Sequence, residues 1–66
     1  MKNLKELKKV IYEDLKPIEN FYDVRVSETL DEKASYVYDV KLNQLFHISE
    51  IEIESEDYVY VRLLNL

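Results

Sequence analysis

Carboxylates are the side chains of this sequence whose spacing most clearly suggests a function. Residues 50–57 hold an acidic ladder, made of Glu50, Glu52, Glu54, Glu56 and Asp57. In an extended strand, alternate side chains point to the same side about 6.6–6.8 Å apart, close to the separation of neighbouring phosphates on a nucleic-acid strand. The ladder therefore predicts a rigid row of charges that fits a phosphate-binding groove on another protein. The alternative interpretation is a solvated strand face that discourages edge-to-edge aggregation.

Catalytic and metal-binding uses of these carboxylates are disfavoured by the rest of the composition. A carboxylate pair can hydrolyse glycosides, but a chain of 66 residues is too short to enclose a sugar. The sequence has no glycine, no cysteine and a single histidine, His47. These counts exclude the usual calcium loop, the Gly-rich phosphate loops and thiolate zinc sites. We expect no enzyme activity, no cofactor and no metal.

The charge is distributed unevenly along the chain. Residues 1–16 hold five lysines and three acids, whereas residues 17–66 hold four basic residues and eleven acids, a net charge of −7. Such an acidic body repels nucleic acid and is attracted to basic surfaces. The charge therefore predicts no nucleic-acid binding, and a DNA-binding protein becomes a plausible partner.

An amphipathic helix is predicted for residues 3–16. Leu4, Leu7, Ile11 and Leu15 recur at helical spacing. Asn3 can cap the first turn, and Pro17 ends the helix because it disfavours helical backbone in the residue before it.

After Pro17 the apolar residues alternate with polar ones, which is typical of strands. The runs 21–28 and 35–42 predict an antiparallel hairpin around the polar turn at residues 30–33. Residues 43–54 are ambiguous, and we interpret them as a short helix capped by Asn43 that merges into the extended acidic segment. The run 58–64 is apolar on both faces, so it predicts a central strand.

These elements predict an α+β fold in one domain over residues 1–66: an N-terminal helix within 1–17, then a ββαβ body over 21–66. A chain of this size buries too little surface to be more than marginally stable, and self-association is a common remedy. We therefore expect homodimerisation to complete the sheet, with Tyr58, Tyr60 and Arg62 as the dimer interface. The charged N-terminus is neither a signal peptide nor a membrane span, so we expect a cytoplasmic protein.

The body also resembles a known family. Residues 22–66, about two thirds of the chain, are similar to the small acidic uracil-DNA glycosylase inhibitor of Bacillus phages that replicate from a terminal protein. The resemblance rests on the segments Tyr22-Asp23-Val24, Asp31-Glu32-Lys33, Tyr36 with Tyr38, Leu42-Asn43-Gln44-Leu45-Phe46, and Val61-Arg62-Leu63.

This resemblance implies a homodimer in the host cytoplasm that mimics DNA and blocks the glycosylase. It implies that Phe46 lies on the short helix and lines a pocket for the enzyme's intercalating leucine. If the register shifts by one, Leu45 takes that place. The family has an acidic residue next to that aromatic, whereas this chain has His47. Glu50, Glu52 or Glu54 must therefore replace that acid as the main phosphate mimic. The predicted partner-binding residues are Leu45, Phe46, Ser49, Glu50, Glu52 and Glu54.

A second functional class stays open. The chain can also be an acidic regulatory or adaptor module, similar to an antitoxin, that docks through apolar contacts without mimicking DNA. Charge reversal at Glu52 and Glu54 distinguishes the two, since it abolishes mimicry and spares an apolar docking surface.

Overall fold

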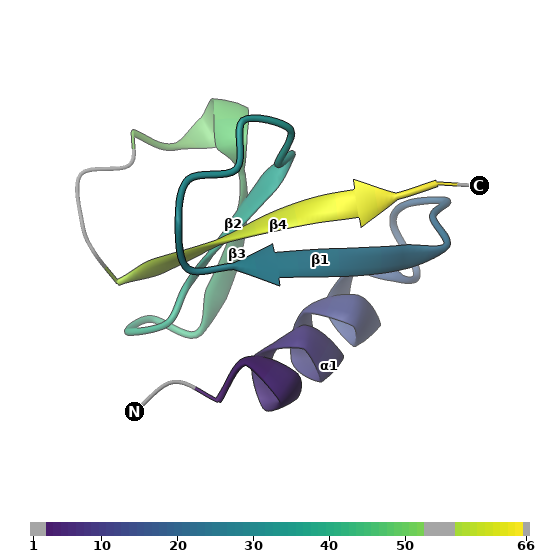
Figure 1. The fold of residues 1–66 in the computed structure, drawn as a ribbon, viewed down its shortest axis with the longest axis horizontal. Coiled ribbons are helices and arrows are strands. Elements are labelled where there is room, and N and C mark those ends of the chain that lie inside the picture. The colour runs from purple at the N-terminus through teal and green to yellow at the C-terminus, as the bar shows by residue number, and fades with distance from the viewer. Residues whose placement is uncertain (1–2, 53–56, 66) are drawn as a thin grey trace.

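One helix packs against a four-stranded antiparallel sheet (Figure 1), which confirms the predicted α+β class. The computed structural model describes residues 3–52 and 57–65. Its elements are α1 (Leu4–Leu15), β1 (Asp23–Ser27), β2 (Tyr36–Asp39), β3 (Gln44–His47), the single 3₁₀ turn η1 (Ile48–Glu50) and β4 (Tyr58–Leu64).

Helix α1 begins and ends where the sequence predicts. The Asn3 Oδ1 atom accepts hydrogen bonds from the backbone N–H groups of Lys5 and Glu6, at 3.1 and 3.3 Å. These bonds satisfy donors that the first turn leaves free. Ile11 and Leu15 are fully buried against the sheet, so the packed stripe anchors the helix to the strands.

Strand β4 occupies the interior of the sheet, as its apolar composition predicts. The strand order is β1-β4-β2-β3, and β4 pairs antiparallel with both β1 and β2. The predicted hairpin between β1 and β2 is therefore wrong, because the two strands run parallel to each other on either side of β4. The connection over residues 28–35 is long enough to cross β4, and it ends with a 3.0 Å hydrogen bond from Ser35 N–H to Val61 O.

The helix predicted from Asn43 onward is also wrong over residues 44–47, which form β3 and pair antiparallel with β2. The turn before β3 explains the difference. The Asp39 Oδ1 atom accepts hydrogen bonds from the N–H groups of Lys41 and Leu42, at 2.9 and 3.0 Å. Asn43 takes the left-handed conformation, with φ of 52°, which asparagine tolerates better than most residues. Asn43 thus closes a hairpin instead of capping a helix, and within residues 43–52 helical structure is limited to η1.

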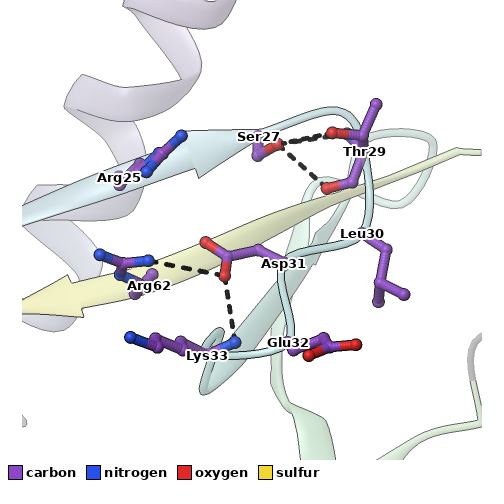
Figure 2. A pocket seen from close by; sticks show the side chains of 8 residues that line it. All are labelled: Arg25, Ser27, Thr29, Leu30, Asp31, Glu32, Lys33 and Arg62. Atoms are coloured by element: carbon purple, nitrogen blue, oxygen red, sulfur yellow. Dashed lines mark hydrogen bonds and ion pairs between the residues drawn. The ribbon is translucent and has the colours of Figure 1, made fainter.

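The two faces of the sheet are covered in different ways. The helix-side face packs against α1, and its core comprises Ile11, Leu15, Val24, Tyr36, Tyr38, Val59 and Val61. The opposite, loop-side face carries the alternate residues of each strand, and the connection over residues 28–35 crosses it (Figure 2). A single helix therefore covers only one face, and polar chain covers part of the other.

Candidate functional site

The predicted partner-binding residues Leu45 and Phe46 lie on opposite faces of the sheet. Neighbouring residues of a strand point to opposite sides. Leu45 is half-buried and packs against the helix-side core, whereas Phe46 pairs with Val37 on the loop-side face. The expectation that Phe46 projects from a helix is therefore wrong. The local geometry gives no helix aromatic of the kind that the resemblance implies.

Ser49 and Glu50 take part in a local network around His47. The His47 Nδ1 atom accepts a hydrogen bond from Ser49 N–H at 3.2 Å and lies 2.7 Å from Ser49 Oγ. Glu50 Oε1 accepts one from His47 N–H at 3.0 Å. These contacts form a capping box for η1, so the Glu50 carboxylate has a structural role. The extended acidic ladder predicted from Glu50 is wrong at its first residue, because Glu50 lies in a 3₁₀ turn.

The rest of the ladder is only partly described. Glu52 is exposed and follows η1, while Glu54 and Glu56 lie outside the described residues. The connection between β1 and β2 carries two further exposed glutamates, Glu28 and Glu32. Ile48 N–H donates to Ser35 O at 2.9 Å, so the end of that connection lies beside η1 (Figure 1).

We define the acidic end as the carboxylates on these two segments, Glu28, Glu32, Glu50 and Glu52. All four side chains are exposed. Among the described residues, Glu28, Glu32 and Glu52 form no hydrogen bond or ion pair. The acidic end therefore presents charge from two segments distant in sequence, and the sequence pattern had indicated only one of them.

Tyr58, Tyr60 and Arg62, the predicted dimer interface, share the loop-side face of β4 and are all half-buried. Tyr58 lies opposite Asp39, and Tyr60 opposite Val37. Arg62 has a partner within its own chain, since its Nη1 atom lies 3.8 Å from Asp31 Oδ1. The hydroxyls of Tyr58 and Tyr60 form no hydrogen bond within the described residues.

A cleft of about 300 Å³ opens between the loop-side face and the connection over residues 28–35 (Figure 2). Its lining residues are Arg25, Ser27, Thr29, Leu30, Asp31, Glu32, Lys33 and Arg62. Three of the four basic residues that follow Pro17 thus line one cleft. Sequence reasoning missed this cluster, because its members are distant in the chain. The sequence offers one indication of such a cluster, which is that only four basic residues occur among the eleven acids of residues 17–66.

The buried tyrosine Tyr36 ties the segment after α1 to the sheet. Its hydroxyl donates a hydrogen bond to Glu19 Oε1 at 2.6 Å. This bond, followed by burial, raises the pKa of Tyr36 to about 12. Burial also raises the pKa of Tyr38. Both groups stay protonated at neutral pH, which suits a structural role.

The described part of the chain contains no group of three or more His, Cys, Asp or Glu side chains placed to hold a metal ion. Within the same residues, no helix is long and apolar enough to cross a membrane.

No family model, no curated protein and no solved structure matches this chain.

Proposed function

We propose that this chain is a non-catalytic inhibitor that occupies the nucleic-acid-binding groove of another protein, with a uracil-DNA glycosylase as the first target to test. The observation that carries the proposal is the acidic end, where three exposed carboxylates without internal partners extend from two adjacent segments. Such carboxylates are free to replace phosphates against the lysines and arginines of a DNA groove. They belong to residues 17–66, whose net charge of −7 favours approach to a basic surface.

This proposal rests on charge, not on an aromatic anchor. Phe46 lies in a strand, half-buried on the loop-side face, so we assign it no pocket-lining role. Binding by charge alone is sensitive to salt, since ions screen exposed charges over about 8 Å at physiological ionic strength. We therefore expect affinity for the target to fall steeply as salt is added.

The experiment is a uracil-excision assay with a matched pair of double variants. Glu28→Lys/Glu32→Lys reverses two carboxylates of the acidic end. Glu6→Lys/Glu13→Lys makes the same change in net charge on α1, where both acids are also exposed. We expect wild type to inhibit at equimolar ratio, the first variant to lose inhibition and the second to retain most of it. Unaffected excision by wild type excludes the glycosylase as target, and equal loss in both variants excludes the acidic end as the binding surface.

The alternative, an acidic regulatory or adaptor module, is favoured by a different observation. Tyr60, Val37 and Phe46 lie in register across three neighbouring strands of the loop-side face. Val37 is fully buried, and the half-buried rings of Tyr60 and Phe46 on either side of it offer an apolar surface for docking or for the expected homodimer. Sedimentation of wild type and Tyr60→Lys tests it: a dimer that the variant dissociates supports this surface, and a monomer in both contradicts it. Charge reversal at the acidic end should leave such docking intact.

A further inference from the structure

The loop-side cleft concentrates positive charge in a protein whose net charge is −5. Arg25 of β1 lies directly opposite Arg62 of β4. On one face of a sheet, side chains in this position have Cβ atoms about 4.5–5.5 Å apart, and like charges there are destabilising. The third cation of the cleft is Lys33, on the connection that crosses this face.

One carboxylate partly offsets these charges. Asp31 Oδ1 lies 3.8 Å from the Arg62 guanidinium and also accepts the backbone N–H of Lys33 at 3.0 Å. Glu32 lines the cleft as well, but its carboxylate points away from Arg62 (Figure 2). Among the described residues, the side chains of Arg25 and Lys33 form no hydrogen bond or ion pair. The lining thus holds three cations and two carboxylates, and only the Asp31 carboxylate forms an ion pair with one of the cations.

We propose that this cleft binds the phosphate group of a small phosphate monoester. Such a group carries a charge of about −1.5 to −2 at pH 7, and Arg25 and Lys33 are two cations of the cleft without an ion pair among the described residues. The planar guanidinium groups of Arg25 and Arg62 can donate paired hydrogen bonds to phosphate oxygens, and Lys33 adds a point charge.

A hydroxyl donor lies at the same site. The Ser27 hydroxyl donates to Thr29 O at 3.0 Å and accepts from Thr29 N–H at 3.2 Å. The Thr29 hydroxyl, 3.2 Å from Ser27 Oγ, can turn its proton toward a bound oxygen. The neighbouring carboxylates of Glu28 and Glu32 repel a polyanion. A single dianionic group of a size that fits about 300 Å³ is therefore favoured over a nucleic-acid strand.

The test is an NMR titration of ¹⁵N-labelled full-length protein with inorganic phosphate and with O-phosphoserine, with sodium chloride added to hold ionic strength constant. We expect saturable shifts at residues 27–33 and at the arginine side chains of the cleft. Arg25→Gln should weaken binding at least about tenfold, because charge-assisted hydrogen bonds are lost. Lys41→Gln is the matched control, since Lys41 is exposed and is the one basic residue after Pro17 that does not line the cleft.

Thermal unfolding separates binding from structure. In phosphate-free buffer, Arg25→Gln should be at least as stable as wild type, because it relieves the pair with Arg62. When phosphate is added, wild type and Lys41→Gln should gain clearly more stability than Arg25→Gln. Equal weakening by both substitutions, or equal shifts at the lysines of α1, would overturn the site. Binding of inorganic phosphate without O-phosphoserine would overturn its assignment to a monoester.

Discussion

The two faces of this sheet are buried by different means. On the helix-side face, apolar side chains of α1 close over valines and tyrosines, and Ile11, Leu15, Val59 and Val61 are fully excluded from solvent. On the loop-side face, Val37 is equally buried, but much of the surrounding surface is polar. There, the partly buried Asp31 meets Arg62, with side-chain exposures of 13% and 29%. One face is a hydrophobic core, and the other is a covered surface with a cleft.

The two faces therefore differ in what they contribute: the helix-side face contributes most of the stability, and the loop-side face carries proposed binding surfaces. Apolar burial contributes about 25 cal/mol per Å², whereas partly exposed ion pairs contribute little. A chain without disulfides therefore depends on the helix-side face to stay folded. The loop-side face is freer to keep unpaired cations and half-buried tyrosines, and both proposed small-ligand and docking surfaces lie there.

The largest expected effect is loss of the helix anchor. Leu15→Ala should destabilise the fold by about 2–5 kcal/mol, because it removes a fully buried side chain and leaves a cavity. A domain of this size is stable by only about 3–10 kcal/mol, so much of the variant should be unfolded at low urea. Urea denaturation followed by circular dichroism measures the change. The exposed Leu42→Ala is the control, and an equal midpoint for the two variants would contradict the assigned core.

Tyr36→Phe should have the next largest effect. It removes the hydroxyl that donates to Glu19, and a hydrogen bond to a charged group contributes about 1.5–3 kcal/mol. Tyr22→Phe is the matched control, because Tyr22 is 60% exposed and its hydroxyl forms no hydrogen bond within the described residues. Similar urea midpoints for the two variants would show that the bond to Glu19 is not formed in solution.

The same tyrosine predicts a change of stability with pH. The folded state raises the pKa of Tyr36 from 10.0 to about 12. A raised pKa means that the protonated hydroxyl stabilises the fold below pH 10, and that this contribution is lost as pH rises from about 10 to about 12. The difference in unfolding free energy between wild type and Tyr36→Phe should therefore shrink over that range. A difference that stays constant to pH 12 would contradict the raised pKa.

Asp39→Ala tests how the loop-side face buries polar groups. Asp39 is 8% exposed, and its carboxylate accepts two backbone hydrogen bonds that shape the β2–β3 turn. Leaving those donors without a partner should cost about 1–2 kcal/mol. Asp39→Asn keeps an acceptor oxygen and should cost less. Hydrogen exchange at Lys41 and Leu42 reports the turn directly, and unchanged protection in Asp39→Ala would count against this account.

Sequence periodicity was sufficient for α1 and for the interior position of β4, because each depends on a local apolar pattern. It was not sufficient for strand pairing, which depends on a connection that crosses β4, nor for residues 44–47. There, Asp39 and Asn43 build a turn that competes with helix capping, since asparagine suits both. The cleft was missed for a related reason. Arg25, Lys33 and Arg62 come together only through the pairing of β1 with β4 and the path of residues 28–35.

The smallest change in the free energy of unfolding is expected for Arg62→Gln, on the polar part of the loop-side face. Arg62→Gln removes a single ion pair at 3.8 Å between partly exposed groups, which should contribute less than about 1 kcal/mol. It also relieves repulsion with Arg25 across the strand pair, so the net cost should be about 0.5 kcal/mol or less. A double-mutant cycle with Asp31→Asn isolates the pair from that repulsion. A coupling energy above about 2 kcal/mol would mean that charge, and not only chain connectivity, holds residues 28–35 over the sheet. The loop-side face would then contribute to stability as the helix-side face does.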